Sequence, residues 1–465
     1  MSAPLILILA VAVAYLAAHV AFDWLAKRFM LVSGAEYLLL GILLGPHVSG
    51  ILSAQTMAGF APLITLALGW IGAIVGTQFY LPALVRIQAR TYRLGFIEAI
   101  LTAFMVGGAS AYLIWLVTGR GDITQSIVPA LALGAIAAVS APAGIEVVTR
   151  KIGGQREPIV LQLQVATAMD ALVGILTMGL LFCIFHPNDT IASRGITPTE
   201  WAVITLAIGV VGGTLFHLFL GGETNVDRLF ISLAGAIILA SGAAAYLHLS
   251  PVLTSMVVGA TLVNTSGSRT VISDTLAKSE RPFYFVLLVF AGASWDPSTV
   301  QWWWAVVLVF LVLRIMGKIG TARLGARLNE ALPELGADWG FALLGQGGLA
   351  IALGLDYSRF NNAVLPHAVF TAAIVSVLFT DVGSARIIHA VMSKLRWRRS
   401  LDDIPGAPLN TPAAGTATAP AGESAAAPGT PSAAAGAPSA PAAETTGASP
   451  AETAPADTPA PAGKE

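Results

Sequence analysis

The chain has 465 residues, of which 55% are apolar and only 11% are charged, and its formal net charge is −1. An average soluble domain is about 45–50% apolar and about 25% charged, so this composition argues against a soluble enzyme and indicates an all-α polytopic membrane protein. The near-zero charge gives no reason to expect nucleic acid as a partner. The single cysteine excludes an intrachain disulfide framework and a thiolate metal site.

Apolar stretches that are long enough to cross a bilayer follow one another along most of the chain. They predict about thirteen transmembrane helices. In chain order these occupy residues 3–25, 34–53, 59–81, 92–117, 125–149, 158–185, 200–220, 228–248, 251–266, 281–295, 301–322, 338–356 and 365–392. The first stretch has no basic region before it and exceeds the usual length of a signal peptide, so we expect a retained span.

Lys and Arg lie mainly in the loops that follow odd-numbered spans. Short cytoplasmic loops carry an excess of these residues, so the pattern predicts a multi-pass protein of the cell's inner (plasma) membrane with its N-terminus outside and its C-terminus in the cytoplasm. We therefore divide the chain into a transmembrane domain, residues 1–393, and a cytoplasmic tail, residues 394–465. Beyond about Asp402 the tail is rich in Ala and Pro with almost no large apolar residue, which predicts disorder.

Two of the predicted spans are interrupted near their middle. The interrupting residues are Pro142 and Gly144 in the fifth span, and Gly345, Gly347 and Gly348 in the twelfth. Two broken helices at matching places in two halves of a transporter predict inverted repeats and a substrate site at the midplane, because the breaks free backbone carbonyls and helix ends to hold an ion. The alternative is that these are ordinary Pro and Gly residues of membrane helices.

An aspartate lies deep in the sixth span. Asp170 is about twelve residues into this span, near the bilayer midplane, where a charge is costly and marks an ion or proton path. The alternative is a buried carboxyl that neighbouring hydroxyls such as Thr167 satisfy. Alkali cations prefer oxygen ligands, so we expect the ion and proton site to combine Asp170 with Ser140, Thr167, Gln346 and the carbonyls freed at the breaks.

The eleventh span supplies two basic residues, Arg314 and Lys318, on one helical face. We expect the deeper one, Arg314, to be the charge partner of Asp170, and Lys318 to extend toward the cytoplasm. Two further acids are weaker candidates: we expect Glu98 to be an entrance or interface residue near the cytoplasmic face, and we assign no firm place to Asp381. Asp170 is then the one acid of the site.

Several motifs together resemble those of one transporter superfamily. They occupy residues 41–46, 250–259, 281–294, 314–317 and 345–348, and they include Gly41, Gly259 and Gly292. In this order the chain from about residue 1 to 393 resembles the monovalent cation:proton antiporters, which include bacterial Na⁺/H⁺ exchangers and glutathione-gated K⁺ efflux systems. The resemblance implies a homodimer in which a mobile core domain moves against a dimerisation domain by elevator-like alternating access.

These observations favour a secondary antiporter that exchanges Na⁺ or K⁺ for H⁺. A carboxylate binds either a proton or a cation, so a site that crosses the membrane only when it is occupied gives exchange. Two alternatives stay open: a sodium-coupled organic-anion symporter on a related fold, and a sensor that has lost transport. We predict no enzyme activity, no cofactor and no resident metal ion, since the sequence shows no nucleophile with a base, phosphate loop or cluster of metal ligands.

Overall fold

The computed structural model describes residues 34–119, 123–152, 158–187, 195–220, 226–266, 269–300, 303–328, 338–381 and 383–402, and these residues form helices and loops without any strand. The predicted first span, residues 3–25, and the tail beyond residue 402 lie outside them. In chain order the elements are α2 (Ala35–Leu44), α3 (Ala54–Gly59), α4 (Ala61–Thr77), α5 (Leu81–Leu84), α6 (Ala89–Val117), α7 (Ile123–Ala138), α8 (Pro142–Ile152), α9 (Pro158–Ile184), α10 (Pro198–Leu220), α11 (Val226–Tyr246), α12 (Pro251–Thr265), α13 (Arg269–Ala293), η1 (Pro297–Thr299), α14 (Trp304–Leu328), η4 (Trp339–Leu343), α15 (Gly347–Ser358), α16 (Pro366–Asp381) and α17 (Ser384–Asp402).

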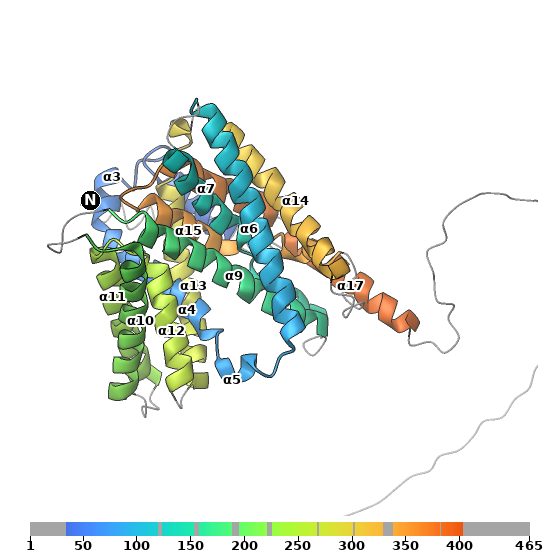
Figure 1. Cartoon of the computed structure of the whole chain (residues 1–465). Helices are drawn as coiled ribbons and strands as arrows, with labels where there is room; N and C mark the ends of the chain where they lie inside the picture. Colours follow the sequence, from blue (N-terminus) through green and yellow to red (C-terminus); the bar gives the residue numbers. More distant parts are fainter. Residues whose placement is uncertain are drawn as a thin grey trace, which may run out of the picture. The chain divides into compact units, whose positions relative to one another are not determined.

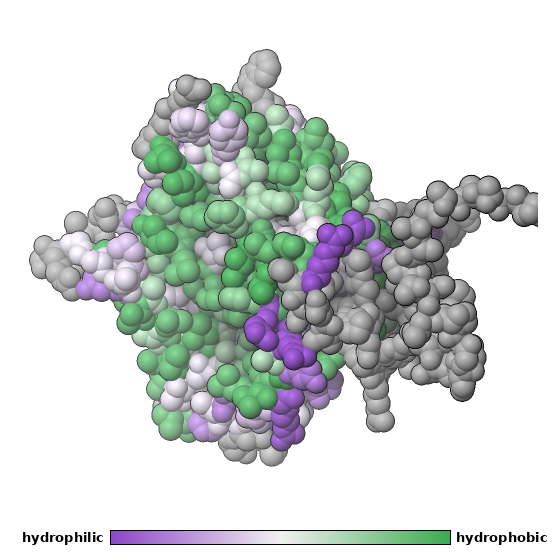
Figure 2. Space-filling view, turned by 45° about the vertical axis from the view of Figure 1, so that its right-hand side comes forward, coloured by the Kyte–Doolittle hydropathy of each residue, from purple (hydrophilic) through white to green (hydrophobic). Residues whose placement is uncertain are grey.

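The described helices have the length and the surface of membrane-spanning segments. Five of them, α6, α9, α10, α11 and α14, are long and apolar enough to cross a bilayer, and α16 with α17 makes a sixth if the bent pair is one span. Large apolar side chains face outward, such as Phe104 on α6 and Leu239 on α11, and Figure 2 shows green apolar surface over much of one face. The chain is a multi-pass membrane protein, and the count of about thirteen spans stays a prediction.

The described helices form two bundles. The first contains α2, α4 and α10 to α13, and the second contains α6 to α9, η4 and α14 to α17. In Figure 1, α10, α11 and α12 lie side by side in the first bundle, and α6 runs beside α14 in the second. Helices pack extensively within each bundle and much less between the two. There α9 touches α10 and α12, and α15 touches α4, α12 and α13.

Glycines bring helices of the first bundle into backbone contact. A Cβ atom at Gly259 of α12 would lie 2.1 Å from the carbonyl oxygen of Ala73 on α4, and one at Gly41 of α2 would lie 2.1 Å from that of Val289 on α13. Gly292 meets α2 in the same way. Any larger residue would force these helices apart. The motif glycines therefore serve the packing of this bundle.

The predicted fifth span is broken, as expected. Helix α7 ends at Ala138 and α8 begins at Pro142. Proline is favoured at a first helical position because its missing N–H would have no intrahelical partner there. Gly144 differs from the prediction: it lies inside α8, where a Cβ would meet the side chain of Ile388 on α17, so it serves close packing rather than the break.

The predicted twelfth span is also broken. The short helix η4 ends at Leu343, and α15 begins at Gly347, whose φ of +65° suits glycine. Gly345 lies within the break. Gly348 is already helical, and a Cβ there would lie 2.2 Å from the ring of Tyr284 on α13, so this glycine allows α15 to approach the first bundle.

Several predicted boundaries differ from the structure. Of the span predicted at 34–53, only Ala35–Leu44 is helical. The span predicted at 281–295 belongs to a longer helix, Arg269–Ala293. The one predicted at 365–392 consists of α16 and α17, which meet at a bend of 48° next to Gly383, whose φ of +104° L side chains rarely adopt. Helix α17 continues to Asp402, past the boundary expected at residue 393. That domain boundary itself stays a prediction.

Candidate functional site

The two breaks meet inside the second bundle. The backbone N–H of Ala141 donates to the carbonyl oxygen of Gly345 at 2.8 Å. The Ser140 hydroxyl donates to the carbonyl oxygen of Leu343 at 2.8 Å, and the side-chain amide of Gln346 donates to a carbonyl of α7 at 2.7 Å. Ser140 and Gln346 are buried. Each break thus supplies hydrogen-bond partners to the other, which lets irregular backbone lie among membrane helices.

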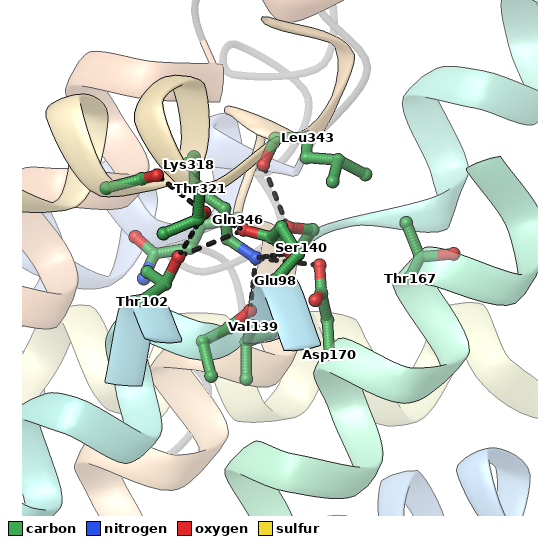
Figure 3. Close-up of polar contacts among 12 residues, drawn as sticks. Glu98, Thr102, Val139, Ser140, Thr167, Asp170, Lys318, Thr321, Leu343 and Gln346 are labelled. Carbon is green, nitrogen blue, oxygen red and sulfur yellow. Dashed lines mark hydrogen bonds and ion pairs between the residues drawn. The ribbon is translucent and has the colours of Figure 1, made fainter. Parts of the chain in front are cut away.

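Asp170 lies on α9 beside this meeting point, and its side chain is completely buried (Figure 3). Its Oδ2 atom accepts a hydrogen bond from the Lys318 ammonium at 2.8 Å. Its Oδ1 atom has no hydrogen-bond partner among the residues that the structure describes. This buried oxygen therefore has unused acceptor capacity, and its binding of a proton or a cation stays a prediction.

The ion-pair partner of Asp170 is Lys318 and not Arg314, contrary to the sequence-based expectation. The Lys318 side chain does not extend to the cytoplasm but is completely buried. Its Nζ atom donates to Asp170, to the carbonyl oxygen of Ala138 at 2.7 Å and to Glu98 Oε2 at 3.1 Å. The end of α7 and two acids thus engage all three donors of the ammonium group.

Glu98 also lies in a different place from the one that the sequence predicted. It lies on α6, only 1% exposed, and forms an ion pair with Lys318 at 3.1 Å. Its Oε1 atom accepts a hydrogen bond from the Thr102 hydroxyl at 3.0 Å. The Thr321 hydroxyl lies 3.2 Å from the same atom, but its one proton has a closer acceptor in the carbonyl oxygen of Gly317 at 2.7 Å. The site therefore contains two carboxylates and not one. The available signal was an acid inside an apolar span with a hydroxyl four residues later, which places both groups on one helical face.

Arg314 binds the breaks instead of the aspartate. Its Nη1 atom donates to the carbonyl oxygen of Leu344 at 2.8 Å, and its Nη2 atom donates to that of Val139 at 3.0 Å. These carbonyls follow the last residues of η4 and α7, where a helix carries partial negative charge. The rigid guanidinium fork can reach two acceptors at once, so Arg314 joins the two half-helices at their negative ends.

Asp381, to which the sequence analysis assigned no firm place, binds the N-terminus of the half-helix α15, whereas Arg314 binds carbonyls at helix C-termini. Its Oδ1 atom accepts from the backbone N–H of Gln346 at 2.7 Å, and its Oδ2 atom accepts from that of Gly347 at 3.0 Å. A carboxylate is stabilising at the N-terminus of a helix because it complements unsatisfied N–H groups and the helix dipole. Asp381 thus holds the start of α15 in position.

The remaining predicted ligands differ in their availability. Thr167 lies on α9, and its hydroxyl donates to the carbonyl oxygen of Gln164 in the same helix at 2.9 Å; Figure 3 shows it apart from the cluster around Lys318. The Oε1 atom of Gln346 is buried without a hydrogen-bond partner in the described part of the chain. Gln346 is therefore a better-placed oxygen donor than Thr167, and binding of an ion by either stays a prediction.

Comparison with known proteins adds independent information. The profile of the family described as "Sodium/hydrogen exchanger, transmembrane" matches residues 35–394. The chain is 26% identical over 418 residues to the glutathione-regulated potassium-efflux system protein of Haemophilus influenzae. That match covers 85% of this chain but only 63% of the relative, so the chain spans less than two thirds of that protein.

Two solved structures share the fold. The structure of the sodium proton antiporter MjNhaP1 from Methanocaldococcus jannaschii at pH 8 matches with a TM-score of 0.62 and 14% identity, over 85% of this chain and 99% of that one. An electron microscopy map of the same antiporter matches with a TM-score of 0.53 and 17% identity, over 84% and 97% of the two chains. At such identities the comparison supports the helical arrangement and nothing finer.

Proposed function

Because the chain belongs to the transmembrane sodium/hydrogen exchanger family, we propose that it is a secondary antiporter that exchanges a monovalent cation, Na⁺ or K⁺, for H⁺. The family consists of transporters and not of enzymes. The observation that carries the proposal is the buried Asp170, which pairs with Lys318 where two broken helices meet.

Exchange follows from competition at one carboxylate. Asp170 holds Lys318 through Oδ2, and either a proton or a partly dehydrated alkali cation replaces the ammonium there. The two ligands exclude each other, so the site carries a cation in one direction across the membrane and a proton in the other. This gives exchange, provided that the empty site does not cross the membrane. Oxygens for the cation come from Asp170 Oδ1, Gln346 Oε1 and the carbonyls at the breaks, with Ser140 and Thr167 as further donors.

Alternating access then requires the second bundle, which holds every residue of the site, to move against the first. The sparse packing between the bundles supports such a movement. The resemblance to the monovalent cation:proton antiporters also leads us to assign the first bundle to a homodimer interface. The distribution of Lys and Arg in the loops supports a cytoplasmic C-terminus.

The test is a proton-flux assay in inverted membrane vesicles. We expect addition of Na⁺ or K⁺ to dissipate an imposed pH gradient, with Li⁺ as a third cation for comparison. Asp170→Asn keeps the shape of the side chain and removes the charge, so vesicles that contain this variant should show no cation-dependent proton flux. Flux at the wild-type rate in the variant would disprove the assignment of Asp170.

A further inference from the structure

The Lys318 ammonium lies between two carboxylates that come from different helices. It contacts Asp170 of α9 at 2.8 Å and Glu98 of α6 at 3.1 Å, and all three side chains are buried (Figure 3). The exchange of a proton for a cation requires only one of these acids. The second acid therefore needs a role of its own, since an extra buried carboxylate is costly in a membrane.

Glu98 is held in a fixed orientation. Its Oε1 atom accepts from the buried hydroxyl of Thr102, and the buried hydroxyl of Thr321 lies 3.1 Å from that of Thr102. Thr102 is on the same helix as Glu98, and Thr321 is on α14 one turn after Lys318. These contacts leave Oε2 to Lys318, so the carboxylate cannot turn away without losing the hydrogen bond from Thr102.

A cation that binds Oδ1 of Asp170 comes close to the Lys318 ammonium on Oδ2 of the same carboxylate, and the repulsion between the two positive charges in this buried site favours displacement of Lys318 from Asp170. The displaced ammonium then has only a backbone carbonyl and Glu98 as partners. An ammonium among membrane helices without a counter-charge is strongly unfavourable. Resting on the proposed function, we propose that Glu98 is a positioning residue that keeps Lys318 paired and in place while the transported cation occupies Asp170.

This role has a specific kinetic consequence. If Glu98 loses its charge, Asp170 becomes the only acidic partner of Lys318, and the cation competes against a tighter pair. We expect Glu98→Gln to raise the apparent KM for the transported cation at least about tenfold, with a much smaller change in the maximal rate. A purely structural role would instead lower the maximal rate through loss of folded protein and leave KM unchanged.

The experiment measures cation-dependent proton flux in vesicles as a function of Na⁺ and of K⁺ concentration. Ser110→Ala is the matched control, because Ser110 is a buried polar residue of the same helix, and it should keep the wild-type KM. Thr102→Val removes the hydroxyl that donates to Glu98 and leaves the charges of Glu98 and Lys318, so we expect a rise in KM of about two- to threefold.

An unchanged KM in Glu98→Gln overturns the proposal. If Glu98→Gln does not reach the membrane, the KM of Thr102→Val is the test. An unchanged KM in that variant also overturns the proposal. A failure of the proposed function looks different, since wild-type vesicles would then show no cation-dependent flux, or Asp170→Asn would show normal flux.

Discussion

Lys318→Ala should be the most destabilising single truncation at the site. Its ammonium is completely buried between Asp170 at 2.8 Å and Glu98 at 3.1 Å. Removal of one partner from a buried ion pair costs about 3–5 kcal/mol, because the other charge stays buried and uncompensated. Here two carboxylates lose the same partner, so we expect the free energy of unfolding to fall by about 5 kcal/mol at neutral pH.

The assay is thermal unfolding of the purified protein in detergent, followed by the fluorescence of its ten tryptophans. Lys278→Ala is the control, since Lys278 is exposed and its truncation should change stability by no more than about 0.5 kcal/mol. Adding Asp170→Asn and Glu98→Gln to Lys318→Ala replaces both stranded charges by amides and should restore much of the loss. A loss below about 1 kcal/mol, or no recovery in the triple variant, would refute the reasoning.

Three further predictions concern Asp170, Arg314 and the contact between the two bundles. Asp170→Asn should abolish exchange and yet accumulate in the membrane at normal levels, which immunoblotting of membranes alongside the flux assay checks. Arg314→Lys should lower the free energy of unfolding by about 1–3 kcal/mol without raising the KM for the cation, because one ammonium group cannot replace a guanidinium that binds a carbonyl at each break. A raised KM with unchanged stability would contradict this. The Ser250 hydroxyl of α12 donates to Asp356 of α15 at 2.6 Å and so connects the two bundles. A cysteine pair at these positions, joined by a short reducible cross-linker, should stop exchange until the link is reduced. Full activity in the linked protein would exclude relative movement there, and each single-cysteine variant is the control.

Local features of the sequence were enough to identify the class of protein and the positions of two helix breaks. Apolar stretches predict membrane helices because every backbone polar group must be satisfied within the bilayer. Both breaks lie where Pro142, Gly345 and Gly347 predict them, since these residues act on the backbone of their own segment. The rise per residue of a helix predicts the depth of Asp170 in the membrane, and the structure shows that its side chain is completely buried.

Tertiary structure alone decided which charges meet. The rise per residue gives the depth of a side chain but not the neighbour that it faces, so the greater depth of Arg314 predicted the wrong partner for Asp170. Lys318 contacts Asp170, which is 148 residues away in the sequence, and Glu98, which is 220 residues away. Arg314 instead contacts the carbonyls at the breaks. These pairings depend on how α6, α9 and α14 are rotated against one another, and that rotation is set by the packing of all their neighbours and not by any one segment of sequence.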